Sequence, residues 1–182
     1  QMDFLDILQN RHSVRKYSGK EIPQSVLLKV LQAGLLSPSS RAICPWQLIV
    51  VQKKDTLYKM SECREGAAKM LANASAAIVM VADKTKSDVW VEDCSIVMSN
   101  MHLMADSLGL GSCWIQGRMR NVADGQTTEA YLQNLLGYPD EFGLEAILSL
   151  GVPAVHAPRR ELSDIPLDKV HFESYQGDTA EE

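Results

Sequence analysis

Apolar residues recur at three- and four-residue spacing in several stretches, which predicts amphipathic helices. A short stripe covers residues 4–8, and a longer one covers 23–35, beginning at a proline suited to a helix start. The longest periodic stretch, 88–108, is rich in methionine and stops at a glycine, so we expect a central helix there. Residues 128–136 carry a further helical patch, whereas 55–71 carries mixed helical signals.

Compact apolar runs bounded by turn or charged residues predict buried strands. These runs cover residues 46–51, 76–82, 112–116 and 144–150. Because the chain contains no internal repeat, low-complexity block or linker, we predict a single α+β or α/β domain over residues 2–175, followed by a polar tail at 176–182. The stretch after Pro153 has little periodicity, so we expect it to lie along another surface rather than to fold alone.

Charge and cysteine content narrow the possible partners. The formal net charge is -5 and the basic residues are dispersed, so no broad surface for nucleic acid is expected. No apolar run approaches the roughly 20 residues of a membrane-spanning helix. The four cysteines have neither Cys-x-x-Cys pairing nor zinc-ligand spacing, so we predict no metal site and no disulfide framework. A reducing, cytoplasmic protein that binds neither nucleic acid nor membrane is expected.

Two short basic segments are candidates for binding phosphate, because guanidinium forks match phosphate oxygens and a hydroxyl adds a neutral donor. The alternative is a pair of solvated surface loops. The first segment contains Arg11, His12, Ser13 and Arg15, and the second contains Arg159 and Arg160.

Two loops offer free backbone groups to a ligand. Residues 37–46 separate the second helix from the first strand, and 109–117 is glycine-rich, although it lacks the spacing of a dinucleotide fingerprint. The acidic pair Glu92-Asp93 is expected to be solvated, and His102 is expected to be a packed imidazole rather than a base. Hydrolase, Walker-type nucleotide and zinc-protease motifs are absent.

Taken in order, these segments resemble the FMN-dependent nitroreductase family from about Phe4 to Tyr175. Each motif alone is weak, whereas their order and separations together are specific. The matching motifs are Arg11-x-Ser13-x-Arg15, Pro38-Ser39-Ser40, Pro45-Trp46, Glu92-Asp93, Leu108 to Ile115, Leu150-Gly151-Val152-Pro153, Pro158-Arg159-Arg160 and His171-Phe172.

The resemblance implies an α+β fold with a central, mainly antiparallel sheet flanked by helices, in an interlocked homodimer with FMN at the subunit interface. It also implies that two electrons pass from NAD(P)H through the flavin to a nitroaromatic, quinone or similar electron-poor small molecule in a ping-pong cycle, without a catalytic side chain. The residues expected to bind the cofactor are Arg11, His12, Ser13, Arg15, Pro38, Ser39, Ser40, Arg41, Ile115, Gln116, Gly117, Arg159 and Arg160.

Three positions depart from the family pattern and leave the substrate class open. Ala42 and Cys44 stand where many members carry an asparagine and a glutamine, and Gln116 stands where glycine is common. We expect Arg41 to compensate at the flavin edge. The alternatives are a flavin-binding or flavin-sensing module without turnover, and a related flavin oxidase or dehalogenase.

Overall fold

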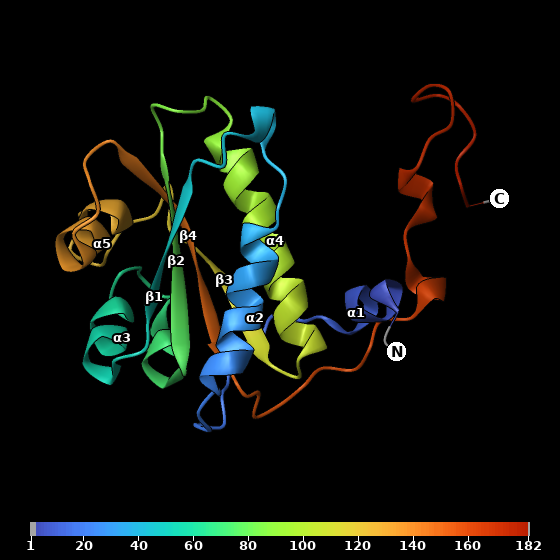
Figure 1. Cartoon of the computed structure of the whole chain (residues 1–182). Helices are drawn as coiled ribbons and strands as arrows, with labels where there is room; N and C mark the ends of the chain where they lie inside the picture. Colours follow the sequence, from blue (N-terminus) through green and yellow to red (C-terminus); the bar gives the residue numbers. More distant parts are fainter. Residues whose placement is uncertain (1–2, 182) are drawn as a thin grey trace.

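The computed structural model describes residues 3–181, and its centre is a four-stranded antiparallel sheet (Figure 1). Residue 2, where the predicted domain begins, and residue 182, where the predicted tail ends, lie outside the described part. The sheet confirms the α+β class, and each predicted strand is present. In the order β1-β2-β4-β3, the strands are β1 (Trp46–Val51), β2 (Ala76–Asp83), β4 (Phe142–Gly151) and β3 (Gly111–Gln116).

The helices follow the predicted stripes with small shifts at their ends. The mixed segment 55–71 divides into a helix and a short 3-10 turn, with a loop between them in which Gly66 adopts φ +76°. The α-helices are α1 (Phe4–Asn10), α2 (Gln24–Leu35), α3 (Lys54–Met60), α4 (Trp90–Ser107) and α5 (Thr128–Leu136). The 3-10 turns are η1 (Ser40–Ala42), η2 (Lys69–Asn73), η3 (Leu162–Asp164) and η4 (Leu167–Lys169).

Helices cover both faces of the sheet (Figure 1). Helices α2 and α4 pack on one face, and α3, η2 and α5 pack on the other. Alternate residues of β2 therefore enter different clusters: Ile78 and Met80 face α4, whereas Val79 faces the opposite layer. Both faces of β2 are buried, which explains its uninterrupted apolar sequence.

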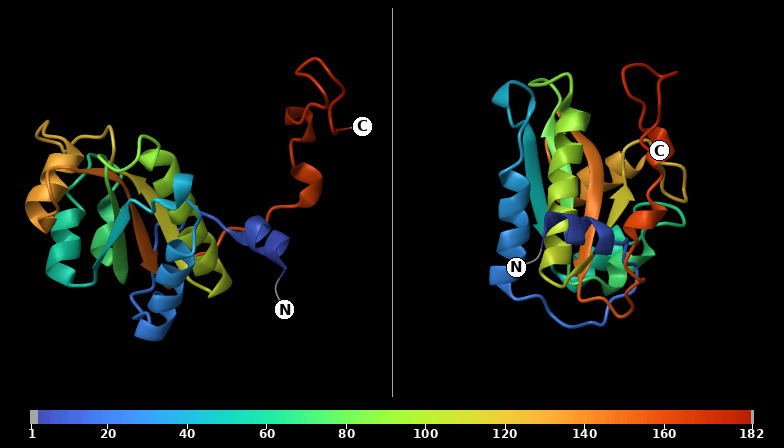
Figure 2. Two further views of the ribbon diagram at one scale, coloured as in Figure 1. Left: turned by 45° about the horizontal axis from the view of Figure 1, so that its top comes forward. Right: turned by 90° about the vertical axis from the view of Figure 1, so that its right-hand side faces the viewer.

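The C-terminal segment leaves the body of the molecule and projects beyond α1 (Figures 1 and 2). We call residues 161–181 the arm. The predicted polar tail folds back on the rest of the arm, because the Phe172 N–H donates to the Asp178 carbonyl (2.9 Å) and the Ala180 N–H donates to the Val170 carbonyl (3.2 Å). Across residues 3–181, no helix has both the length and the apolar character required to cross a membrane.

Candidate functional site

The end of α1 carries a cluster of positive charge. The Arg11 guanidinium lies 3.1 Å from His102 Nε2 on α4, and the Arg160 guanidinium donates to the Arg11 carbonyl. Burial, followed by repulsion from Arg160, lowers the pKa of Arg11, while Asp106 acts in the opposite direction. Asp106 is already engaged by Asn10 Nδ2 at 3.1 Å. The cluster thus holds more positive charge than its own carboxylate balances.

His102 fixes the position of this cluster. Its Nδ1 hydrogen-bonds the Ser112 hydroxyl on β3, and its Nε2 faces Arg11, which is a donor only. Burial and then the Arg11 charge lower the pKa of His102 to about 4, so the ring is neutral near pH 7. This matches the packed imidazole that we predicted.

The segment that follows α1 is attached to the edge of the sheet. Ser13 pairs with Ser112, and the Val14 N–H donates to the Ser112 carbonyl at 2.9 Å. A Cβ at Gly111 would lie 2.7 Å from the Val14 side chain, so only glycine permits this approach. Arg15 is exposed just beyond the attached stretch.

The two C-terminal arginines have different surroundings. Arg160 joins Arg11, and its N–H also donates to the Gln9 carbonyl at 3.0 Å. Arg159 instead forms an ion pair with Asp6 and donates to Gln9 Oε1 at 2.7 Å. In this structure Arg160 is therefore the one that adds charge beside Arg11.

His12 lies beside the cluster but faces elsewhere. Its Nδ1 lies 2.8 Å from the Asn10 carbonyl, and its ring meets His156 edge-on with centroids 5.7 Å apart. The structure thus keeps His12 near the predicted phosphate site without directing it at Arg11.

The serine loop, residues 37–46, is held at the other end of α4 by Asp93. Asp93 Oδ1 accepts from the Ser40 N–H at 2.9 Å, and Oδ2 accepts from the Ser87 hydroxyl at 3.3 Å. Asp93 is 3% exposed, so the prediction that the Glu92-Asp93 pair is solvated was wrong for Asp93. Its position next to Cys94, on the buried face of α4, was the signal that could have shown this.

The same loop contains unusual backbone geometry. Arg41, Ala42 and Cys44 have φ values of 55°, 54° and 48°, a region that costs about 1 kcal/mol or more for residues with a side chain. The Ser39 hydroxyl steadies the turn by accepting from the Cys44 N–H at 2.8 Å. Pro38, Arg41 and Cys44 are exposed, so the loop is directed outward.

The end of β3 presents backbone rather than free side chains. Ile115 is 1% exposed in the core. Gln116 Oε1 accepts from Trp114 Nε1 at 2.9 Å, so this amide is occupied within its own strand. The Gly117 and Arg118 N–H groups donate to the Glu145 carbonyl at 3.2 and 3.0 Å. Because β3 is an edge strand, no other strand among the described residues pairs with its outer side beyond the bridge at Ser13, although the Arg64 guanidinium donates to the Gln116 carbonyl at 3.4 Å.

Glu145 is a buried acid that the sequence pattern did not reveal, since it lies inside an apolar strand. It is 3% exposed where the pairing of β4 with β2 shifts register. Glu145 Oε1 accepts from the Ser95 hydroxyl at 2.8 Å, and Oε2 has no partner among the described residues. Burial raises the pKa of Glu145 to about 7.

The predicted site residues outside β3 form two separate groups within one chain. Asp93 holds the serine loop at one end of α4, and Asp106 lies near the arginine cluster at the other end. At 1.5 Å per residue, these two positions are about 20 Å apart along the helix. Figure 1 shows η1 at one end of α4 and α1 at the other. One protomer alone does not bring the two groups together.

Comparison with known proteins assigns the family. The profile described as Nitroreductase family matches residues 8–64 and 62–152. A relative from Archaeoglobus fulgidus, provisionally named NADH dehydrogenase/NAD(P)H nitroreductase, is 36% identical over 94% of this chain and 98% of its own. A solved FMN-dependent nitroreductase from Clostridium difficile R20291 is 42% identical, with a TM-score of 0.91 over 93% of this chain and 99% of that one. The chain therefore belongs to the nitroreductase family of oxidoreductases, as the ordered motifs predicted.

Proposed function

We propose that this protein binds FMN and passes two electrons from NAD(P)H to an electron-poor small molecule, such as a nitroaromatic or a quinone, in a ping-pong cycle. The observation that carries the proposal is the partly buried Arg11 beside Arg160, whose combined charge is not balanced by the carboxylate near them. A phosphate monoester supplies the missing negative charge. FMN dependence in the similar Clostridium difficile structure supports the same cofactor.

The residues fit a flat cofactor that carries a phosphate. Arg11, Ser13, Arg15 and Arg160 would hold the phosphate, while His102 keeps Arg11 in place. The open edge of β3 would offer backbone groups to the ring. Bound flavin supplies the redox chemistry, because it takes a hydride from a nicotinamide and delivers two electrons to an acceptor. The protein contributes binding, orientation and charge.

The test is the visible absorption spectrum of the purified protein without oxygen. We expect flavin bands that bleach when NADH or NADPH is added and return when a nitroaromatic or quinone is added. Bands that persist with both donors would instead indicate a flavin-binding module or an oxidase. No bands after soaking with FMN would contradict the proposal.

We further propose that the complete flavin site forms in a homodimer. The two groups of site residues lie about 20 Å apart on α4, so a second chain is needed to place a serine loop beside an arginine cluster. The arm supports this, because it extends from the body (Figure 2) and large apolar side chains along it are exposed to solvent. These include Leu162, Ile165, Leu167, Val170, Phe172 and Tyr175.

Phe172→Glu is expected to weaken dimerisation about 10- to 100-fold, because burying a phenylalanine in an interface contributes about 1.5–3 kcal/mol. Sedimentation equilibrium measures the dissociation constant, and FMN retention should fall in parallel. Tyr58→Glu is the matched control, since Tyr58 is 63% exposed on α3, on the opposite side of the molecule from the arm (Figure 1). Equal dimer strength in both variants would contradict the role of the arm.

A further inference from the structure

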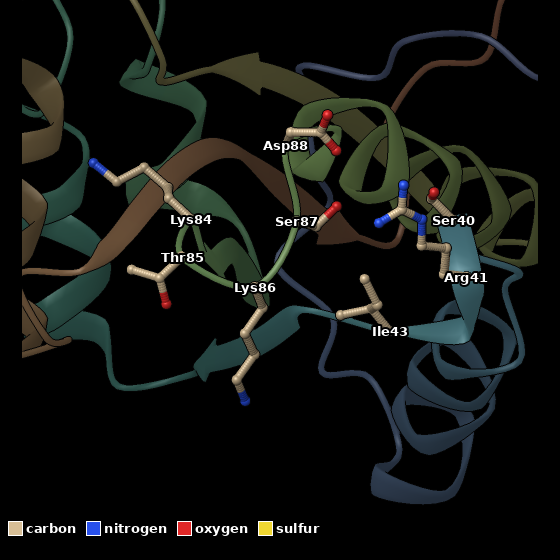
Figure 3. Close-up of a pocket in the computed structure, with 8 residues that line it drawn as sticks. All are labelled: Ser40, Arg41, Ile43, Lys84, Thr85, Lys86, Ser87 and Asp88. Atoms are coloured by element: carbon tan, nitrogen blue, oxygen red, sulfur yellow. The ribbon is translucent and has the colours of Figure 1, made fainter.

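Two cavities lie side by side at the end of the sheet where β2 and β3 finish. The first, of about 320 Å³, lies between the serine loop and residues 84–88 (Figure 3). The second, of about 300 Å³, lies between Trp90 and residues 117–121. Lys84 lines both. Figure 3 shows Lys84 extending away from Arg41, on the far side of its loop. Because Lys84 lines both, the two cavities adjoin, and we call their combined lining the basic groove.

The groove concentrates positive charge in a chain whose net charge is -5. Within residues 3–181, none of its cations has a carboxylate within 4 Å. The lining also contains two carboxylates, Asp88 and Glu129, so the cations outnumber the anions; Glu129 Oε2 accepts from the Leu144 N–H at 2.7 Å, which holds that side chain in place. The cations are Arg41, Lys84, Lys86, Arg118 and Arg120.

The walls of the first cavity are held in place by hydrogen bonds. The buried Asp93 joins Ser40 on one wall to Ser87 on the other. Asp83 Oδ1 accepts from both the N–H (2.9 Å) and the hydroxyl (2.6 Å) of Thr85, which shapes the loop between them. The first cavity therefore exists before any ligand binds, which lowers the entropic cost of binding.

An aromatic surface accompanies the charge in the second cavity. Trp90 is half-buried, and one edge of its ring packs against Gly143, where a Cβ would come within 2.8 Å of it. Indole rings bind purine bases by stacking. A ligand that suits this groove is therefore extended, carries phosphates and has a flat base.

We propose that the basic groove binds the phosphorylated adenosine half of the pyridine nucleotide donor, with the base on Trp90 and the phosphates on Lys84 and its neighbouring cations. This rests on the proposed function, because a nicotinamide donor must reach the flavin. The groove is bordered by Ser40 and Arg41 on one side and by Gly117 on another, and these are residues predicted to bind FMN. Adenosine phosphates held here lie next to the loops that would receive the nicotinamide.

The test is isothermal titration of the FMN-loaded protein with 2′,5′-ADP, which carries the adenosine and phosphates but no nicotinamide. Lys84→Gln and Arg120→Gln should each weaken binding about 5- to 10-fold and raise the KM for NADPH, with kcat and FMN content unchanged. Lys54→Gln is the control, since it removes the same charge at the start of α3, beyond the other end of β1. Inorganic pyrophosphate serves as an anion without a base.

Weaker 2′,5′-ADP binding in the groove variants alone supports the proposal. Binding that is absent in the parent, or equally affected by Lys54→Gln, overturns it. Pyrophosphate that binds as tightly as 2′,5′-ADP also overturns it, because the groove would then hold only an anion. Failure of the proposed function has a different signature: neither NADH nor NADPH would bleach the flavin of the parent protein, whatever 2′,5′-ADP does.

Discussion

Arg15→Ala is expected to weaken FMN binding about 30-fold, equivalent to about 2 kcal/mol, because it removes a charge-assisted contact to the cofactor phosphate. Arg15 is exposed beyond the stretch that Ser13 and Val14 attach to β3, and no hydrogen bond or ion pair to its side chain is found in the described chain. Its guanidinium is therefore available to a ligand, and its loss should leave the free energy of unfolding nearly unchanged. Fluorescence titration of the apoprotein with FMN measures the affinity.

Lys16→Ala provides the matched control. Lys16 is also exposed and also cationic, and its contact with the rest of the chain is the backbone carbonyl that accepts from the Ala154 N–H at 2.9 Å. In an extended segment its side chain points to the opposite side from Arg15. If both variants lose the same affinity, the effect is general electrostatic attraction and the phosphate assignment of Arg15 fails.

Glu145→Gln is expected to stabilise the protein by about 2 kcal/mol at about pH 8 and to have little effect at about pH 5. Burial raises the pKa of Glu145 from 4.5 to about 7 in the folded chain. The folded state therefore holds a proton that the unfolded chain releases, and stability falls as the pH rises between these values. The neutral amide removes this loss, although one of its N–H groups lacks a partner where Oε2 now lies.

Urea unfolding of parent and variant at both pH values checks this expectation. Glu141→Gln is the control, because Glu141 is an exposed acid just before the same strand, and its stability difference from the parent should be small at both pH values. An equal gain for Glu145→Gln at both pH values would mean that packing, rather than the proton, determines the effect.

Much of the fold was predictable because the signals for helices and strands are local. The apolar run of β1 and the stripe of α5 coincide with the predicted ranges 46–51 and 128–136. The choice between α/β and α+β did not follow from periodicity, because strand direction depends on which strands pair across the chain. The family resemblance supplied it, and the antiparallel sheet confirmed it.

The residue types of the candidate site were predictable from the sequence, but which of these residues lie next to one another was not. Arg159 and Arg160 are equivalent in sequence, but the nearby Asp6 engages Arg159 and leaves Arg160 beside Arg11. The acidic neighbour of Asp93 favours a solvated pair, whereas the fold buries Asp93 between two loops.

The sequence by itself determined the elements, the family and the set of basic and hydroxyl residues that suit a phosphate-bearing cofactor. Only the tertiary structure decided that Glu145 is buried with an unpaired oxygen, that Lys84 and Arg120 share one groove, and that the serine loop lies far from Arg11. The physical reason is the distance along the chain over which each effect acts. Propensity and periodicity act within a few residues, whereas burial, charge balance and cavities arise where distant segments meet.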